Sequence, residues 1–219
     1  MQEDSVLLID KPSGMTSFGV VARVRRKLSQ QLGKKAKVGH TGTLDPFATG
    51  LMIIVTGKEC RNAGTYSKLD KVYEATIRLG QTSSTGDPEG ELTEVSDTIP
   101  TADDVKEALG QFIGDIQQTP PIYSAIKING ERAYKLARKG ETVEMPVRTV
   151  TIFSLDLIDY TYPEVKIRVH VSSGTYIRTL AEDLGKALGT GAYCTGLRRT
   201  KIADFSIDDS VATSEYETY

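Results

Sequence analysis

The segment Lys71–Gly80, KVYEATIRLG, carries apolar or aromatic side chains at residues 73, 75, 77 and 79, while the even-numbered positions carry Val, Glu, Thr and Arg. The segment Val165–Val171, VKIRVHV, repeats this period of two, with Val or Ile at every odd position. Strict alternation predicts extended strands whose two faces meet different environments, one buried and one exposed. Any fold of this chain must therefore bury one face of each of these strands.

Helical and strand patterns are mixed along the rest of the chain. Thr101 and Asp104 have the spacing of a capping box, and Gly33 is a natural helix stop. Further strands are expected at Ser5–Ile9, Leu51–Val55 and Val147–Leu157, and helices at Thr16–Leu32, Thr101–Phe112, Glu131–Lys139 and Thr175–Leu188. Because strands and helices do not alternate regularly, the sequence predicts the α+β class rather than a doubly wound fold.

Composition limits the class of protein. The chain has 219 residues, 39% of them hydrophobic and 26% charged, which is typical of a globular protein with a substantial core. Its longest apolar run, Leu51–Val55, is too short to span a membrane, and its first ten residues do not resemble a secretory signal. Cys60 and Cys194 lie far apart and form no disulfide or zinc pattern. We therefore expect a cytoplasmic protein without membrane association.

Charge is unevenly distributed along a chain whose net charge is only −2. Between Asp10 and Asp45 there is no acidic residue, and eight of the 27 Lys and Arg residues lie there. Such a segment suggests a polyanionic partner bound on one face. The alternative is a solvated helix face.

Motifs for common cofactors are absent. The sequence contains no phosphate-binding loop, no dinucleotide fingerprint, no HExxH and no GxSxG, and it has only two histidines, His40 and His170. A histidine-rich metal site is thereby excluded, whereas a carboxylate-bound Mg²⁺ is not. Any chemistry has to rest on carboxylates, tyrosines and basic residues.

Asp45 lies in the glycine-rich stretch GHTGTLDPFATG, Gly39–Gly50. Pro46 disfavours helix at Asp45, so the carboxylate is expected to project from an ordered loop just before a buried strand. Two interpretations stay open at this point. The loop either aims a functional carboxylate, or it is a turn in which Asp45 caps nearby N–H groups.

Three further residues also have two interpretations each. Tyr73 is either a core tyrosine or a platform on which a base stacks. Arg178 precedes Glu182 by four residues, which fits a surface pair, but a first-turn arginine opposes the helix dipole and suggests a buried carboxylate partner instead. His40 either caps its loop or wedges into a nucleic-acid stack, and Leu197 is by default a core residue.

Six motifs occur in the order in which one known family has them. They are KPSGMTS, GHTGTLDPFATG, KVYEATIRLGQTSSTGD, QTPPIYSAIKINGERAYKLARKG, VSSGTYIRTLAEDLG and TGLRRTKIADF. Over roughly Ser5–Phe205 the chain resembles the TruB family of tRNA pseudouridine synthases. The resemblance implies a pseudouridine-synthase fold, with a mixed, largely antiparallel central sheet flanked by helices and loops.

The resemblance also implies an activity, the isomerisation of uridine 55 in the T arm of tRNA to pseudouridine, without cofactor or metal. Asp45 matches the essential aspartate, Tyr73 the residue that stacks on the target base, and Arg178 the arginine paired with the aspartate. Tyr176 and Leu197 match pocket-lining positions. His40 matches the histidine that fills the gap left in the T loop when the base flips out.

Domain organisation and RNA contacts follow from the same resemblance. We expect one catalytic domain over residues 1–219, with an insertion at about residues 120–146 that clamps the T arm, and no C-terminal domain of the PUA type. Candidates for contacts to the RNA backbone are Lys11, Arg25, Arg26, Lys34, Lys35, Lys37, Arg61, Arg132, Lys135 and Arg138. Two other functions stay possible. One is a tRNA-binding or tRNA-folding module in which catalysis is dispensable. The other is a role in a guide-RNA complex, against which the compact ATGLMIIVTGK segment argues. We expect a monomer that acts without guide RNA.

Overall fold

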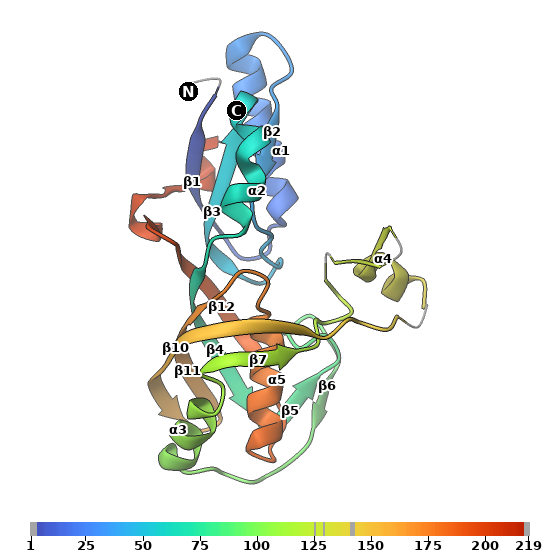
Figure 1. Ribbon diagram of the computed structural model, residues 1–219, viewed down its shortest axis with the longest axis vertical. Coiled ribbons are helices and arrows are strands. Elements are labelled where there is room, and N and C mark those ends of the chain that lie inside the picture. The colour runs from blue at the N-terminus through green and yellow to red at the C-terminus, as the bar shows by residue number, and fades with distance from the viewer. Residues whose placement is uncertain (1–3, 125, 129, 141–142, 217–219) are drawn as a thin grey trace. The chain divides into compact units, whose positions relative to one another are not determined.

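The computed structural model describes residues 4–124, 126–128, 130–140 and 143–216, except the side chains of Tyr134 and Arg138. The chain forms two compact units (Figure 1). Unit 1 consists of residues 1–73 and 197–219, and unit 2 of residues 74–196. Strands β4 (Lys71–Leu79) and β12 (Ala192–Ile202) contribute residues to both units. The expected single catalytic domain stays a prediction, because two compact units can belong to one catalytic domain.

Unit 1 combines a sheet with one long helix. Its strand order is β14-β1-β3-β12, with β2 paired to β3 and β13 to β12, and the β1–β14 and β12–β3 pairs are parallel. Besides β4 and β12, the elements of unit 1 are β1 (Val6–Lys11), α1 (Ser17–Leu32), β2 (Val38–His40), β3 (Thr49–Thr56), the 3-10 turns at Gly57–Asn62, Ile207–Asp209 and Thr213–Tyr216, α2 (Ala63–Ser67), β13 (Phe205–Ser206) and β14 (Val211–Ala212).

Local signals account for the limits of α1. Thr16 accepts a hydrogen bond from the Gly19 amide at the N-terminus, and Gly33 ends the helix with φ of 65°. The buried stripe includes Val20, Val24 and Leu28. Strand β3 is buried along almost its whole length, and Leu51, Ile53, Val55 and Ile202 form a core cluster.

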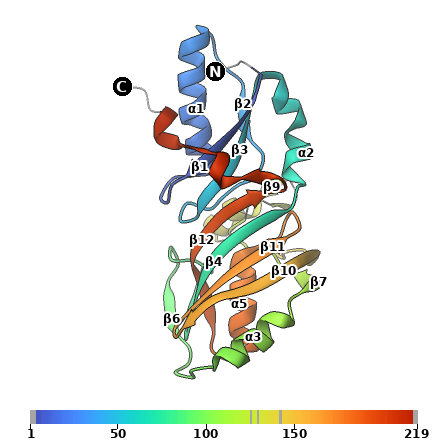
Figure 2. The same ribbon diagram turned by 90° about the vertical axis from the view of Figure 1, so that its left-hand side faces the viewer.

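Unit 2 contains a sheet with the strand order β12-β4-β11-β10-β7 (Figure 2). The β10–β11 and β10–β7 pairs are antiparallel. Helix α3 contacts β10 and α5. Besides β4 and β12, the elements of unit 2 are β5 (Gln81–Ser83), β6 (Leu92–Glu94), α3 (Ala102–Gly110), β7 (Gly114–Gln118), β8 (Lys127–Ile128), β9 (Glu131–Arg132), α4 (Ala133–Arg138), β10 (Arg148–Thr161), β11 (Glu164–Val171) and α5 (Ile177–Ala187).

Alternation along β4 and β11 is confirmed, because buried and less buried residues alternate without exception along Lys71–Leu79. The capping box of Thr101 and Asp104 is present at the start of α3. The prediction missed β2, β7, β12 and the β5–β6 ribbon, which lack a period of two or are very short. It also extended the helix at Glu131–Lys139 too far, because its first two residues pair with β8. The α+β class with a mixed, largely antiparallel sheet is confirmed. No helix of the described residues is long and apolar enough to cross a membrane.

Gly50 is the position where the backbone of unit 1 tolerates no side chain. Its φ is +109°, and a Cβ would lie 2.3 Å from the carbonyl oxygen of Arg199. We expect Gly50→Ala to lower the free energy of unfolding by about 3 kcal/mol or more, since backbone strain and overpacking each cost about 1–3 kcal/mol. Urea unfolding at pH 7 measures this loss.

Gly64→Ala in α2 is the matched control, because a Cβ there meets nothing within 4 Å. It should stabilise unit 1 slightly, by about 0.4–1 kcal/mol, through the unfolded chain. Equal unfolding midpoints for the two variants would contradict the close approach of β3 and β12 at Gly50.

Candidate active-site residues in the two units

The loop that carries Asp45 is tied down by the segment between β1 and α1. The Ser17 hydroxyl donates to the Leu44 carbonyl at 2.9 Å and accepts from the Leu44 amide at 2.8 Å. On the other side of Asp45, the Gly14 amide donates to the Pro46 carbonyl at 2.8 Å. Both neighbours of Asp45 are therefore fixed by side-chain or backbone contacts from outside the loop. The half-buried aspartate lies on a rigid support.

Lys11 belongs to this support rather than to a surface that could meet phosphate. Its side chain is 0% exposed, and its ammonium donates to the carbonyls of Pro12, Met15 and Pro46 at 2.7–3.1 Å. The expectation that Lys11 contacts the RNA backbone does not fit this geometry, because all three donors of the ammonium already have acceptors within the protein. The sequence shows the charge but not its burial.

Tyr73 lies near the N-terminal end of β4, in the part of this strand that belongs to unit 1, and is 8% exposed. The guanidinium carbon of Arg199 lies 6.0 Å from the centroid of its ring. Leu197 and His40 are both half-buried, Leu197 on β12 and His40 at the end of β2. Unit 1 thus holds four of the predicted site residues: Asp45, Tyr73, His40 and Leu197.

Lys71 is a second buried cation in unit 1, two residues from Tyr73. Its side chain is 7% exposed and donates to the carbonyls of Ser67 and Leu69. Burial, and secondarily the positive charge of Arg199, lower the pKa of Lys71 to about 8. A depressed lysine pKa shows that the local environment does not fully compensate its charge.

Tyr176 is held in unit 2 by Gln118, a residue that is 1% exposed. The Gln118 amide nitrogen donates to the Tyr176 carbonyl at 3.0 Å, and its amide oxygen accepts from the Tyr176 backbone nitrogen at 2.8 Å. Gln118 therefore brackets the residue directly before α5. The sequence analysis did not single out Gln118, although it is the first residue of the QTPPIYSA motif.

Arg178 is 4% exposed and is enclosed by three acceptors of unit 2. Its Nη1 lies 3.2 Å from Asp87 Oδ2 and donates to the Thr85 carbonyl at 2.7 Å, while Nη2 donates to the Tyr123 carbonyl at 2.9 Å. Arg178 therefore has a buried carboxylate partner, and this partner is Asp87 rather than the half-buried Glu182. The predicted Asp45–Arg178 pair joins residues of different units and stays a prediction.

Asp87 is fixed in turn by its own loop. Its Oδ1 accepts from the Thr85 hydroxyl at 2.6 Å and from the Glu89 amide at 3.1 Å. Asp87 is not among the site residues that the sequence predicts, although it ends the motif KVYEATIRLGQTSSTGD. The signal was a single Gly-Asp pair in an acidic loop, and nothing local points from it to an arginine 91 residues later.

A cavity of about 510 Å³ lies in unit 2 beside the residues that bind the Arg178 guanidinium. Thr85 and Tyr123, whose carbonyls hold Arg178, line it, as do Glu182 and Lys186 of α5 and Met145. Burial raises the pKa of the Glu182 carboxyl above its ordinary value. In the described part of the chain, no three His, Cys, Asp or Glu side chains come close enough to hold a metal ion.

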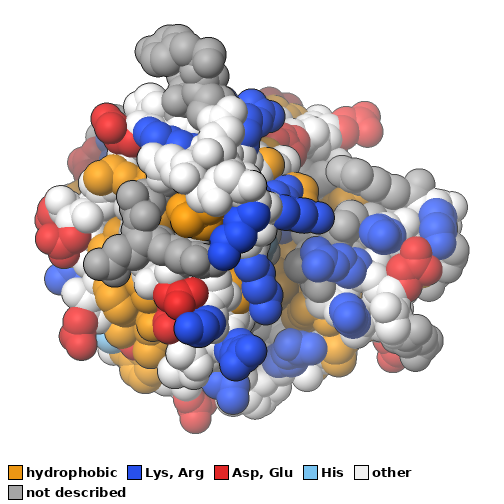
Figure 3. Space-filling model, turned by 90° about the horizontal axis from the view of Figure 1, so that it is seen from above, with side chains coloured by type: hydrophobic (Ala, Val, Ile, Leu, Met, Phe, Trp, Pro, Cys, Tyr) orange, Lys and Arg blue, Asp and Glu red, His pale blue; other side chains and the backbone are white. Residues whose placement is uncertain are grey.

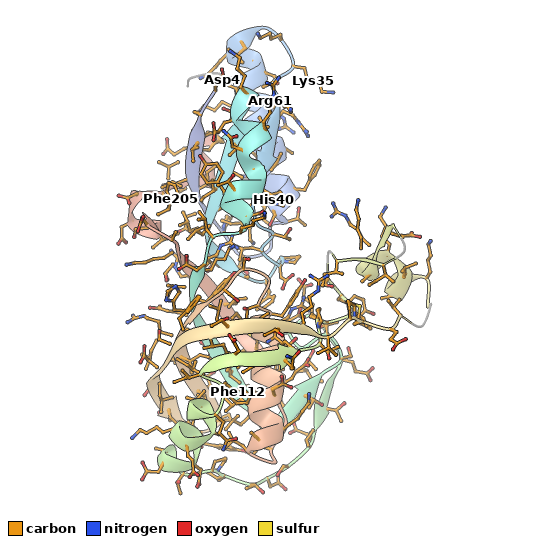
Figure 4. The ribbon with its side chains drawn as sticks, viewed as in Figure 1. Asp4, Lys35, His40, Arg61, Phe112 and Phe205 are labelled. Atoms are coloured by element: carbon orange, nitrogen blue, oxygen red, sulfur yellow. The ribbon has the colours of Figure 1, made fainter. Side chains whose placement is uncertain are left out.

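The remaining basic candidates are accessible. In unit 1, Arg26, Lys34, Lys35, Lys37 and Arg61 are exposed, and the half-exposed Arg25 lies 5.5 Å above the ring of Phe18. In unit 2, Arg132 and Lys135 are exposed, whereas the Arg138 side chain lies outside the described residues. Figure 3 shows Lys and Arg side chains exposed on the face that it draws. Within unit 1, Figure 4 shows Lys35 and Arg61 toward one end and His40 nearer the other.

Comparison with known proteins gives family matches along most of the chain. Residues 25–177 match the model of the TruB family pseudouridylate synthase N-terminal domain, and residues 178–218 match the tRNA pseudouridylate synthase B C-terminal domain. A relative from Phocaeicola vulgatus, named tRNA pseudouridine synthase B, is 47% identical over 98% of this chain and 92% of its own length. A relative of the same name from Dechloromonas aromatica is 46% identical over 99% of this chain and 71% of its own length.

The chain belongs to the TruB family of pseudouridylate synthases. Solved structures agree with this assignment. A chain in the crystal structure of a Cbf5-Nop10-Gar1 complex has a TM-score of 0.73 at 29% identity, over 96% of this chain. A chain in the structure of an H/ACA RNP bound to a substrate RNA containing 2'-deoxyuridine has a TM-score of 0.69 at 25% identity. This TruB family chain spans only about half of each of those chains, 52% and 51%.

Replacing Asp87 should destabilise the protein strongly. Asp87→Asn keeps an acceptor for the Thr85 hydroxyl but removes the charge beside buried Arg178. Breaking a buried ion pair by removing one partner costs about 3–5 kcal/mol. Urea unfolding at pH 7 should therefore show a loss of that order. Asp183→Asn is the control, because the Asp183–Lys186 pair is exposed at Lys186 and such pairs contribute about 0–1 kcal/mol. Equal losses would contradict the assigned role of Asp87.

Lys71 should make stability depend on pH in the alkaline range. Its pKa is about 8 in the folded protein and near 10.5 in the unfolded chain, so the unfolded chain binds more protons between these values. Below pH 8, the buried charge of Lys71 lowers the free energy of unfolding by its full amount. As the pH rises from 8 to 10.5, Lys71 loses its proton in the folded protein and the free energy of unfolding increases. Relative to Lys71→Met, the wild type should gain on the order of 2–3 kcal/mol over this range. Parallel stability curves for the two proteins would show that the Lys71 pKa is ordinary.

Proposed function

We propose that this chain isomerises uridine 55 in the T loop of tRNA to pseudouridine. The observation that carries the proposal is the identity of 46–47% over nearly the whole chain to relatives named tRNA pseudouridine synthase B. The geometry of the described residues supports it. In unit 1, a rigid loop presents the Asp45 carboxylate. In unit 2, Asp87 and two backbone carbonyls hold the buried Arg178.

The reaction exchanges one bond of uracil for another. The bond from the sugar C1′ to N1 of uracil breaks, the base turns, and C1′ joins C5. The proton of C5 is lost to solvent and N1 gains a proton, so the product has the composition of the substrate. Such chemistry needs a group at C1′ and a surface that holds the detached base. It needs no external oxidant or reductant.

We assign the residues as follows. Asp45 acts at C1′, as a nucleophile or as a base. Tyr73 stacks on the target uracil, and Arg178 orients the Asp45 carboxylate. Tyr176 and Leu197 line the pocket of the base, and His40 occupies the space that the flipped base leaves in the T loop. The support of Lys11 and Ser17 holds Asp45 in place and limits how far the carboxylate can move.

RNA binding has to offset the cost of extruding a base, which is a few kcal/mol. Exposed Arg26, Lys34, Lys35 and Lys37, together with Arg61, Arg132 and Lys135, are suited to phosphate contacts, which release counterions. The insertion at about residues 120–146 would clamp the T arm. Near its start, the Tyr123 carbonyl accepts a hydrogen bond from Arg178. The protein would act in the cytoplasm as a monomer, without guide RNA, cofactor or metal. The higher identity to the synthase B relatives than to the Cbf5-containing complex supports independence from guide RNA.

Asp45→Asn should abolish turnover while RNA binding survives. A T-arm stem-loop labelled with tritium at uridine C5 loses its label when C5 joins C1′. The wild type should release tritium, and Asp45→Asn should release it at least roughly 10⁴-fold more slowly, which is typical for removal of a group that acts directly in the reaction. Filter binding should show RNA affinity within about threefold of the wild type.

The exposed Asp204 provides a matched isosteric control, and Asp204→Asn should leave the rate unchanged. If Asp45→Asn keeps its rate, the role of Asp45 is wrong. If the wild type binds the stem-loop but never releases tritium, the protein is a tRNA-binding or tRNA-folding module.

A further inference from the structure

Arg199 is the largest of the fully buried side chains, with 1% of its surface exposed. It lies on β12 within the motif TGLRRTKIADF, directly after Arg198, which forms an exposed ion pair with Asp10 at 2.7 Å. The two neighbouring arginines thus have different surroundings. A buried guanidinium is costly unless its donors and charge are compensated, so the contacts of Arg199 need an explanation.

Those contacts bracket the loop that carries Asp45. Arg199 Nε donates to the Leu51 carbonyl at 2.7 Å, and Nη2 donates to the Gly42 carbonyl at 3.2 Å. Gly42 lies three residues before Asp45 and Leu51 six residues after it. On a third side, the guanidinium carbon lies 6.0 Å from the centroid of the Tyr73 ring. One side chain therefore touches both ends of the Asp45 loop and the proposed stacking tyrosine.

The charge of Arg199 is not neutralised by a carboxylate, because no ion pair of Arg199 occurs among the residues that the structure describes. Two carbonyl dipoles and the face of an aromatic ring surround it instead. The lowered pKa of Lys71 has Arg199 as its second cause, which agrees with a positive charge that is felt by its neighbours. Core packing alone would be served better by an apolar residue of similar size.

We propose that Arg199 is a positioning residue that fixes the ring of Tyr73 relative to the loop bearing Asp45. This inference rests on the proposed function. The planar fork of arginine can hold two carbonyls and a ring face at once, whereas a lysine ammonium can reach only part of this set. Loss of the fork would let the loop and the ring move independently, and a misplacement of about 1 Å costs roughly 10²-fold in rate.

The experiment compares Arg199→Met, Arg199→Lys and the core control Leu28→Ala, a fully buried position of α1. Tritium release from the T-arm stem-loop gives kcat and KM, and thermal unfolding gives the stability of each variant. At a temperature where all three are folded, Arg199→Met should lower kcat by at least about tenfold with KM within about threefold. Arg199→Lys should recover part of the loss. Leu28→Ala should match the wild-type kcat despite its lower melting temperature.

A second measurement does not depend on turnover. At saturating RNA, a stem-loop with 2-aminopurine in place of the target uridine should have its fluorescence quenched in the wild-type complex to the extent that this base stacks on Tyr73. Arg199→Met should reduce this quenching at saturating RNA, and Leu28→Ala should not. Absence of tritium release by the wild type would reject the proposed function and leave the quenching comparison as the test of Arg199. Equal kcat and equal quenching for Arg199→Met and Leu28→Ala would overturn the positioning role. If Arg199→Met does not fold, Arg199→Lys decides by the same two comparisons.

Discussion

Backbone carbonyls that accept hydrogen bonds from buried cations hold the functional loops of this protein. Lys11 binds three carbonyls around the Asp45 loop, and Arg199 binds two more at the ends of that loop. In unit 2, Arg178 binds the carbonyls of Thr85 and Tyr123 in addition to Asp87. Loops leave many carbonyls without a partner in a sheet or helix, and a buried unpaired carbonyl is costly. A cation with several donors satisfies such groups and fixes the loop at the same time.

This arrangement explains why the aspartate loop can be rich in glycine and still be rigid. Gly50 lets β3 and β12 approach each other closely, whereas the stiffness of the loop comes from contacts outside it. Ser17 closes two hydrogen bonds with Leu44, the residue before Asp45. The loop thus owes its conformation to α1, β1 and β12 rather than to its own propensities. Substitutions of Ser17 or Arg199, whose side chains hold this loop, should therefore act on the Asp45 carboxylate.

The sequence predicted those parts of the fold that depend on local chemistry. Alternation in β4, the stop at Gly33 and the capping box at Thr101 each involve residues a few positions apart. The burial of Lys11 and the Arg178–Asp87 pair could not be predicted in this way. Each depends on segments that meet only in the folded chain, and a lysine or arginine has the same sequence signal whether phosphate or a carbonyl meets it. Motif order indicated the candidate site residues, and geometry was needed to find the contacts of Asp87, Gln118 and Arg199.

The two units prepare their functional groups separately. Asp45 and Tyr73 are fixed within unit 1 by Lys11, Ser17 and Arg199, and Arg178 is fixed within unit 2 by Asp87 and two carbonyls. A guanidinium that Asp87 already orients does not need Asp45 to define its direction, so little ordering remains to be done if the two residues meet. The same holds for the aspartate, whose loop is held at both of its neighbours. Groups that are ordered in advance lose less entropy when RNA brings the reacting atoms together, and this lowers the barrier that binding energy has to overcome.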